Sequence, residues 1–96
     1  MKVRLHAQAR AEFFEAVEYY ANESTSAPER FIAEFEEAAR EIGVHPHRYR
    51  TIWNTTHQKE FHSFPYSLVY RILDDIVQID AVPHDRQRTG YWKKRV

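Results

Sequence analysis

Residues 66–82, YSLVYRILDDIVQIDAV, decide the fold because they carry the clearest secondary-structure pattern in the chain. In residues 66–73 every second side chain is a tyrosine, a leucine or an isoleucine, and this two-residue period is typical of a strand. Two aspartates then favour a turn, and residues 76–82 supply the partner strand. Pro83 ends that strand, because proline has no amide hydrogen to donate. The stretch therefore predicts a pair of antiparallel strands.

A short strand and a helix are expected at the start of the chain. Residues 2–6 alternate charged and apolar side chains, as a strand does. From about Ala7 the apolar residues recur at steps of three and four, which places them on one face of a helix. The polar residues 22–26 end this first helix.

A second helix is expected directly afterwards. Ser26 and Glu29 have the spacing of a capping box, and Pro28 stands in the first turn, where its missing N–H group does no harm. Gly43 fits the left-handed position that stops a helix, and Pro46 prevents its continuation. Two amphipathic helices with a short link predict an antiparallel hairpin.

The remaining segments complete an α+β fold in one domain, residues 1–96. We expect a loop over residues 44–56, with one short strand near Ile52, and a strand over residues 58–64 that Pro65 ends. The order is therefore strand, helix, helix and three antiparallel strands, and the first strand joins the sheet non-locally. The helical hairpin is expected to cover one face of this small sheet. The other face is expected to stay open, flanked by a basic tail.

The formal net charge is zero, but the charges are unevenly distributed along the chain. Nine glutamates lie between Glu12 and Glu41, against two arginines in the same stretch. The tail, residues 84–96, holds five cations against Asp85 alone. An acidic middle and a basic end imply two different surfaces. The basic surface suits phosphate groups or an acidic partner.

Composition excludes several classes of protein. Without cysteine the chain forms no disulfide and no thiolate metal site. Its histidines match no recognised metal spacing, and Gly43 and Gly90, the two glycines, form no phosphate-binding loop, so no metal and no cofactor are expected. No apolar run approaches the roughly 20 residues that cross a bilayer, and no signal peptide is recognised. We therefore expect a cytoplasmic protein without membrane contact.

The second half of the chain carries a recognisable set of motifs. These are FPYSLVYRI at residues 64–72, VPHDRQR at residues 82–88 and YWKKR at residues 91–95. Together they resemble the C-terminal half of RelE/ParE-type toxins of type II toxin–antitoxin systems, including those described as plasmid stabilisation proteins. The strand and two helices at the front resemble the N-terminal half, so the resemblance covers nearly the whole chain.

The resemblance implies a bacterial toxin that inhibits growth unless its antitoxin, encoded by a neighbouring gene, binds it. RelE-like members cut messenger RNA on the ribosome, whereas ParE-like members poison DNA gyrase. A protein of the same fold that is only a non-toxic interaction module is a third possibility. Growth inhibition through gyrase is the preferred expectation, and a metal-independent endoribonuclease is the alternative.

The choice between the two targets depends on a few residues near the end of the chain. Cleavage of RNA without a metal needs a base, an acid and cations for the phosphate. His84, Arg86 and Tyr91 are the candidates for these catalytic roles. In ribonuclease members a basic residue also lies on the central strand, where this chain has the neutral Ser67. The missing cation weakens the ribonuclease hypothesis and leaves the assignment as an enzyme open.

A gyrase poison needs a surface that binds its target, and it needs no catalytic acid–base pair. The candidate target-binding residues are Arg86, Arg88, Trp92 and Lys93. Arg86 and Trp92 also have a purely structural alternative, as does the catalytic candidate His84. Trp92 would then anchor the tail onto the sheet, and Arg86 would form an ion pair within the protein. His84 would cap the end of the last strand.

Overall fold

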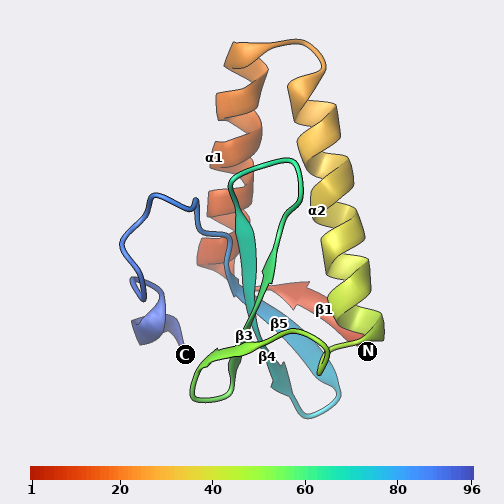
Figure 1. Cartoon of the computed structure of the whole chain (residues 1–96), viewed down its shortest axis with the longest axis vertical. Helices are drawn as coiled ribbons and strands as arrows, with labels where there is room; N and C mark the ends of the chain where they lie inside the picture. The colour runs from red at the N-terminus through yellow and green to blue at the C-terminus, as the bar shows by residue number, and fades with distance from the viewer.

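The computed structural model describes all 96 residues, and its elements follow the expected order. They are β1 (Lys2–Leu5), α1 (Ala7–Glu23), α2 (Ala27–Val44), β2 (Thr51–Trp53), β3 (Thr56–Glu60), β4 (Ser67–Leu73), β5 (Ile76–Ala81) and the short 3-10 helix η1 (Lys93–Arg95). The two helices lie side by side as an antiparallel hairpin, and the tail lies next to α1 (Figure 1). No helix is both long and apolar enough to span a membrane.

The sheet has five strands in the order β1-β5-β4-β3-β2. β1 runs parallel to β5, whereas the other neighbours are antiparallel. The non-local pairing of the first strand is therefore confirmed, and so is the short strand near Ile52. Asp74 takes a left-handed conformation in the β4–β5 turn, with φ of 56°. Aspartate tolerates this conformation better than most residues.

The hairpin covers one face of the sheet, and Phe31 of α2 lies at the centre of the contact. Its side chain is fully buried, and five aromatic rings lie within 5.1–6.0 Å of its ring, centroid to centroid. These rings come from α1 and from the segment around the start of β4: Phe13, Tyr20, Phe61, Phe64 and Tyr66. The expected packing of helices on one face of the sheet is confirmed.

The caps of α2 differ from the prediction. The side chain of Ser26 makes no capping hydrogen bond, and the hydroxyl of Ser24 accepts one from the Ala27 amide at 3.0 Å instead. Gly43 lies inside the last turn of α2, and its φ is not positive, so its assignment as a left-handed stop is wrong. A Cβ atom there would lie 3.0 Å from the Met1 carbonyl oxygen and from Val3 Cγ2. Glycine at this position lets β1 approach the helix.

β3 is shorter than expected, because it ends at Glu60 and not near Phe64. The Glu34 carboxylate of α2 accepts hydrogen bonds from the amides of His62 and Ser63. These bonds draw the following loop onto the helix, and both Phe61 and Phe64 turn into the core. A side chain that is distant in sequence therefore sets the end of this strand.

The face of the sheet opposite the helices is not open throughout, so that expectation is wrong in part. Val69 of β4 and Ala81 of β5 are fully buried there beneath Trp92 of the tail. Ile52 and Trp53 of β2 pack against the edge of this second cluster. The tail is therefore a packed part of the fold.

Candidate functional site

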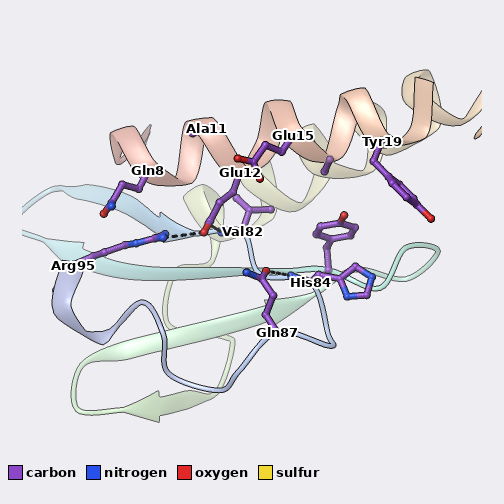
Figure 2. A pocket seen from close by; sticks show the side chains of 11 residues that line it. Gln8, Ala11, Glu12, Glu15, Tyr19, Val82, His84, Gln87 and Arg95 are labelled. Atoms are coloured by element: carbon purple, nitrogen blue, oxygen red, sulfur yellow. Dashed lines mark hydrogen bonds and ion pairs between the residues drawn. The ribbon is translucent and has the colours of Figure 1, made fainter. Parts of the chain in front are cut away.

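Glu12 of α1 holds the tail in place. Its carboxylate accepts hydrogen bonds from the Val82 amide at 2.8 Å, the Tyr91 hydroxyl at 2.8 Å and Arg95 Nη2 at 2.9 Å. Figure 2 shows Arg95 reaching towards Glu12 across the gap between the tail and α1. The two side chains are only 15% and 12% exposed, so water screens the pair weakly. One carboxylate therefore joins a helix, the end of β5 and the tail.

Trp92 packs the tail against the sheet. Its side chain is 4% exposed, and its ring meets Trp53 edge-on with 6.0 Å between centroids. The Lys93 ammonium lies 4.9 Å from the centre of the Trp53 ring, a distance suited to a cation–π contact. In this conformation the Trp92 ring is not presented to a partner, which matches its structural alternative as an anchor.

Tyr91 is held as a hydrogen-bond donor. Burial, together with the hydrogen bond to Glu12, raises the pKa of its hydroxyl well above the usual value. The phenol therefore stays neutral at pH 7, with its proton directed at Glu12. In this geometry the Tyr91 hydroxyl is not free to act as a general acid or base.

His84 directs its contacts at its own loop. Its Nδ1 accepts a hydrogen bond from the Arg86 amide at 3.0 Å, and its backbone amide donates to Gln87 Oε1 at 2.8 Å. The ring meets Tyr66 edge-on at 5.0 Å between centroids, and burial raises the pKa of Tyr66 to about 12. His84 also forms a bridge with Tyr66 beyond the ends of β4 and β5. These contacts match its structural alternative as a cap.

The central strand holds no cation at the position expected for a ribonuclease. Ser67 is buried, and its hydroxyl accepts a hydrogen bond from Gln58 Nε2 at 3.2 Å. Further along β4, Arg71 does carry a charge, but it forms a two-point ion pair with Asp80, at 2.7 and 3.2 Å. Asp80 is an extra residue in β5, since Val69 pairs with Ala81 and Tyr70 pairs with Ile79. Such a bulge redirects side chains.

Three of the predicted target-binding residues are free. Arg86, Arg88 and Lys93 are exposed, and none of them lies within 4.0 Å of a carboxylate oxygen. Arg88 shares a cleft of about 590 Å³ with Tyr91 and Trp92. Arg86 instead lines a separate groove beside Tyr19 and Glu23 of α1. The structure therefore divides the expected basic surface into two parts.

A further groove runs along α1 and meets the tail. Figure 2 shows Gln8, Glu12, Glu15 and Tyr19 on its helical side and His84, Gln87 and Arg95 on the other. The role of Glu12 was not predicted, because its position resembles that of the other helical glutamates. Its signal in the sequence is that Glu12 lies one turn from the small apolar residues Ala9 and Ala16, at the boundary between the polar and apolar faces of the helix.

A helical hairpin on a mixed sheet, with a cationic C-terminal segment anchored across the opposite face, places the chain in the class of RelE/ParE-like proteins. The family model described as "ParE toxin of type II toxin-antitoxin system, parDE" matches residues 3–89. The chain belongs to this family of toxins, and the resemblance found in its motifs is confirmed. Membership implies a cognate antitoxin as its partner.

Comparison with solved structures agrees on the fold. A chain of the chromosomal ParDE toxin–antitoxin system from P. aeruginosa superimposes with a TM-score of 0.66. The match covers 88% of this chain and 95% of that chain at 13% sequence identity. At this identity the likeness concerns the fold alone. No curated protein sequence matches the chain.

Proposed function

We propose that this toxin inhibits bacterial growth by binding DNA gyrase, and that an antitoxin encoded by the neighbouring gene neutralises it in the cytoplasm. One observation carries the proposal. The groups that would transfer protons in RNA cleavage are hydrogen-bonded within the protein. Four cations of the tail remain exposed and form no ion pair: Arg86, Arg88, Lys93 and Lys94. Such a surface suits recognition of a target rather than chemistry on one.

The ribonuclease alternative requires a free acid and base beside the bound phosphate. The Tyr91 hydroxyl donates its hydrogen bond to Glu12, and His84 Nδ1 accepts one from the Arg86 amide. Ser67 is neutral and buried. These two contacts and the missing cation favour the gyrase hypothesis over the endoribonuclease hypothesis.

Arg86 is the residue we propose to contribute most to target binding. Arginine is enriched among the residues that dominate protein interfaces, because its planar group donates several hydrogen bonds. Arg86 is exposed beside Tyr19, an aromatic side chain that is itself 56% exposed. An exposed arginine next to an exposed tyrosine forms a compact patch for a protein partner. Arg88 and Lys93 lie on a separate basic surface nearer the sheet, which is proposed as a second contact with the target.

The test is a gyrase supercoiling assay with purified toxin, run beside a map of messenger RNA cleavage in cells. We expect inhibition of supercoiling, and we expect Arg86→Ala to weaken it by about tenfold or more, the effect of losing roughly 1.4 kcal/mol of binding. The melting temperature should hardly change, because removing an exposed arginine affects stability little. Arg40→Ala, an exposed change on α2, is the matched control and should inhibit like the wild type.

Two outcomes would contradict the proposal. Cleavage at ribosome-bound codons with unimpaired gyrase would indicate the RelE-like alternative. Normal growth on expression without the antitoxin would indicate a non-toxic interaction module.

A further inference from the structure

The two layers of the molecule carry opposite net charges. Residues 7–44, which form the helical hairpin, contain nine glutamates and three arginines, a net charge of −6. All other residues contain eleven lysines and arginines against five acidic residues, a net charge of +6. A neutral chain is therefore a strongly polarised molecule. Its acidic layer covers one face of the sheet, and its basic groups gather elsewhere.

Four of these cations form what we call the cationic rim: Arg50, Arg88, Lys93 and Lys94. Arg50 and Arg88 line one cleft, and Arg88 and Lys94 line the adjoining hollow. Lys93 lies over Trp53 of β2, the strand that begins directly after Arg50. All four side chains belong to exposed residues. The rim therefore extends from the edge of the sheet to the end of the tail.

The cations of the rim form no ion pair within the protein. None of these four cations lies within 4.0 Å of a carboxylate oxygen. The nearby Glu12 forms its ion pair with Arg95, and Asp80 forms its ion pair with Arg71. Glu60 and Asp85 line the cleft but make no ion pair with the rim, and no carboxylate lines the adjoining hollow. Several unpaired cations in a row complement a polymer with regularly spaced negative charges.

The aromatic rings beside the rim decide which polymer fits. Proteins grip single-stranded nucleic acids by stacking bases on exposed aromatic faces. Here Trp92 is buried, Lys93 covers a face of Trp53, and Arg95 lies over the Tyr91 ring at 5.1 Å. These contacts occupy the faces that bases would use. A rim that offers cations without free stacking surfaces fits the phosphates of a duplex, which keeps its bases inside.

We infer that the cationic rim binds the sugar–phosphate backbone of duplex DNA without regard to sequence. The inference rests on the proposed function, because gyrase acts on duplex DNA and a toxin bound to gyrase lies close to that DNA. Arg86, in its separate groove, would then contact the protein while the rim contacts the nucleic acid. The acidic helices, which repel phosphate, cover the opposite face of the sheet.

The experiment measures fluorescence anisotropy of a labelled 20-base-pair duplex titrated with the full chain at 50 to 200 mM KCl. If about three phosphates are neutralised, log Kd should change with log salt concentration with a slope of about 2.7, so affinity should fall about 40-fold over this range. The variant Arg88→Gln/Lys93→Gln/Lys94→Gln should lose most of the affinity and most of the slope. Circular dichroism melting confirms that it is folded.

A matched control removes the same charge from the helical layer. Arg10→Gln/Arg30→Gln/Arg40→Gln replaces the three exposed arginines of residues 7–44 and should bind DNA like the wild type. Equal loss of binding in both triple variants would overturn the inference, because net charge alone would explain it. Absence of binding at 50 mM KCl would also overturn it, as would tighter binding of a single-stranded RNA of the same length.

A supercoiling assay with the same variants separates this inference from the proposed function. In one outcome, a rim variant that no longer binds DNA still inhibits gyrase fully. That result would refute a role for DNA binding by the rim in gyrase inhibition, but gyrase would remain the target. Salt-dependent DNA binding by a wild-type toxin that leaves gyrase active would refute the gyrase hypothesis and support the rim.

Discussion

The two faces of the sheet are stabilised in different ways. On the helical side a continuous aromatic and aliphatic cluster is buried between layers, and many non-directional contacts share the stabilisation. On the tail side the apolar cluster has three buried residues, and charged or polar contacts at Glu12, Asp80 and Arg95 complete it. The first arrangement tolerates small local changes better, whereas the second depends on a few groups. This difference predicts where single substitutions have global or local effects.

The largest effect is expected from Phe31→Ala, which tests the helical side. Removing a buried aromatic ring leaves a cavity, so we expect a loss of about 3–5 kcal/mol in the free energy of unfolding. Denaturant titration followed by circular dichroism measures it. Phe14→Ala on the exposed side of α1, where the ring is 52% exposed, is the control and should change stability by less than about 0.5 kcal/mol. Similar effects of the two variants would contradict the described packing.

A smaller and more local effect is expected from Glu12→Gln. Glutamine keeps an acceptor for the Val82 amide. It places an NH2 group where Tyr91 and Arg95 donate to Oε2, and it loses the charge that attracts Arg95. These losses should reduce stability by about 2 kcal/mol. Both tryptophans of the chain lie in the cluster under the tail, so a red-shifted fluorescence spectrum reports release of the tail. Glu15→Gln, one turn along α1 and exposed, is the matched control. An unshifted spectrum in Glu12→Gln would show that Trp92 alone retains the tail.

The smallest expected effect is a fall in the free energy of unfolding at alkaline pH. It involves tyrosines on both faces of the sheet and is absent at neutral pH. Burial raises the pKa values of Tyr66 and Tyr70 to about 12, and Tyr91 is shifted in the same direction. The folded state therefore prefers the neutral phenols. Their contribution is complete below pH 10 and is lost as the pH rises through 10 towards 12. Urea titrations at pH 8 and pH 11 measure it, and Tyr91→Phe should reduce the difference between them. Equal stability at both pH values would contradict the described burial.

The same contrast explains how much of the structure the sequence could predict. On the helical side, burial imposes a period on the chain, so both helices and the β4–β5 hairpin were recognised from residue spacing alone. The tail side has no such period. Trp92 lies among cations, and nothing in that spacing distinguishes an anchor from an exposed contact. The face of the sheet was therefore expected to be open where Trp92 covers it.

Local rules failed where distant residues intervene. Gly43 was assigned to a helix stop because glycine is frequent there, but the close approach of Met1 and of Val3 of β1 accounts for it. Glu12 was grouped with solvent-facing glutamates, since its partners lie about 70 to 83 positions away in the chain. Among the candidate site residues, the chemical types were recognisable from the sequence. Their division between the groove of Arg86 and the cleft of Arg88 depends on the path of the tail.

The contact between Glu12 and the tail has a genetic consequence. Under the proposed function, a cell that loses its antitoxin survives only if the toxin is inactivated, and a change that unfolds the protein is one route. Glu12 offers another, because a single-nucleotide change from a glutamate codon to lysine would place a positive charge against Arg95. The tail would be repelled while the aromatic core stayed intact. Selection for survivors should therefore recover full-length, folded toxin with substitutions at Glu12. These substitutions would lie far in the gene from the codons of the tail, whose surface they disrupt.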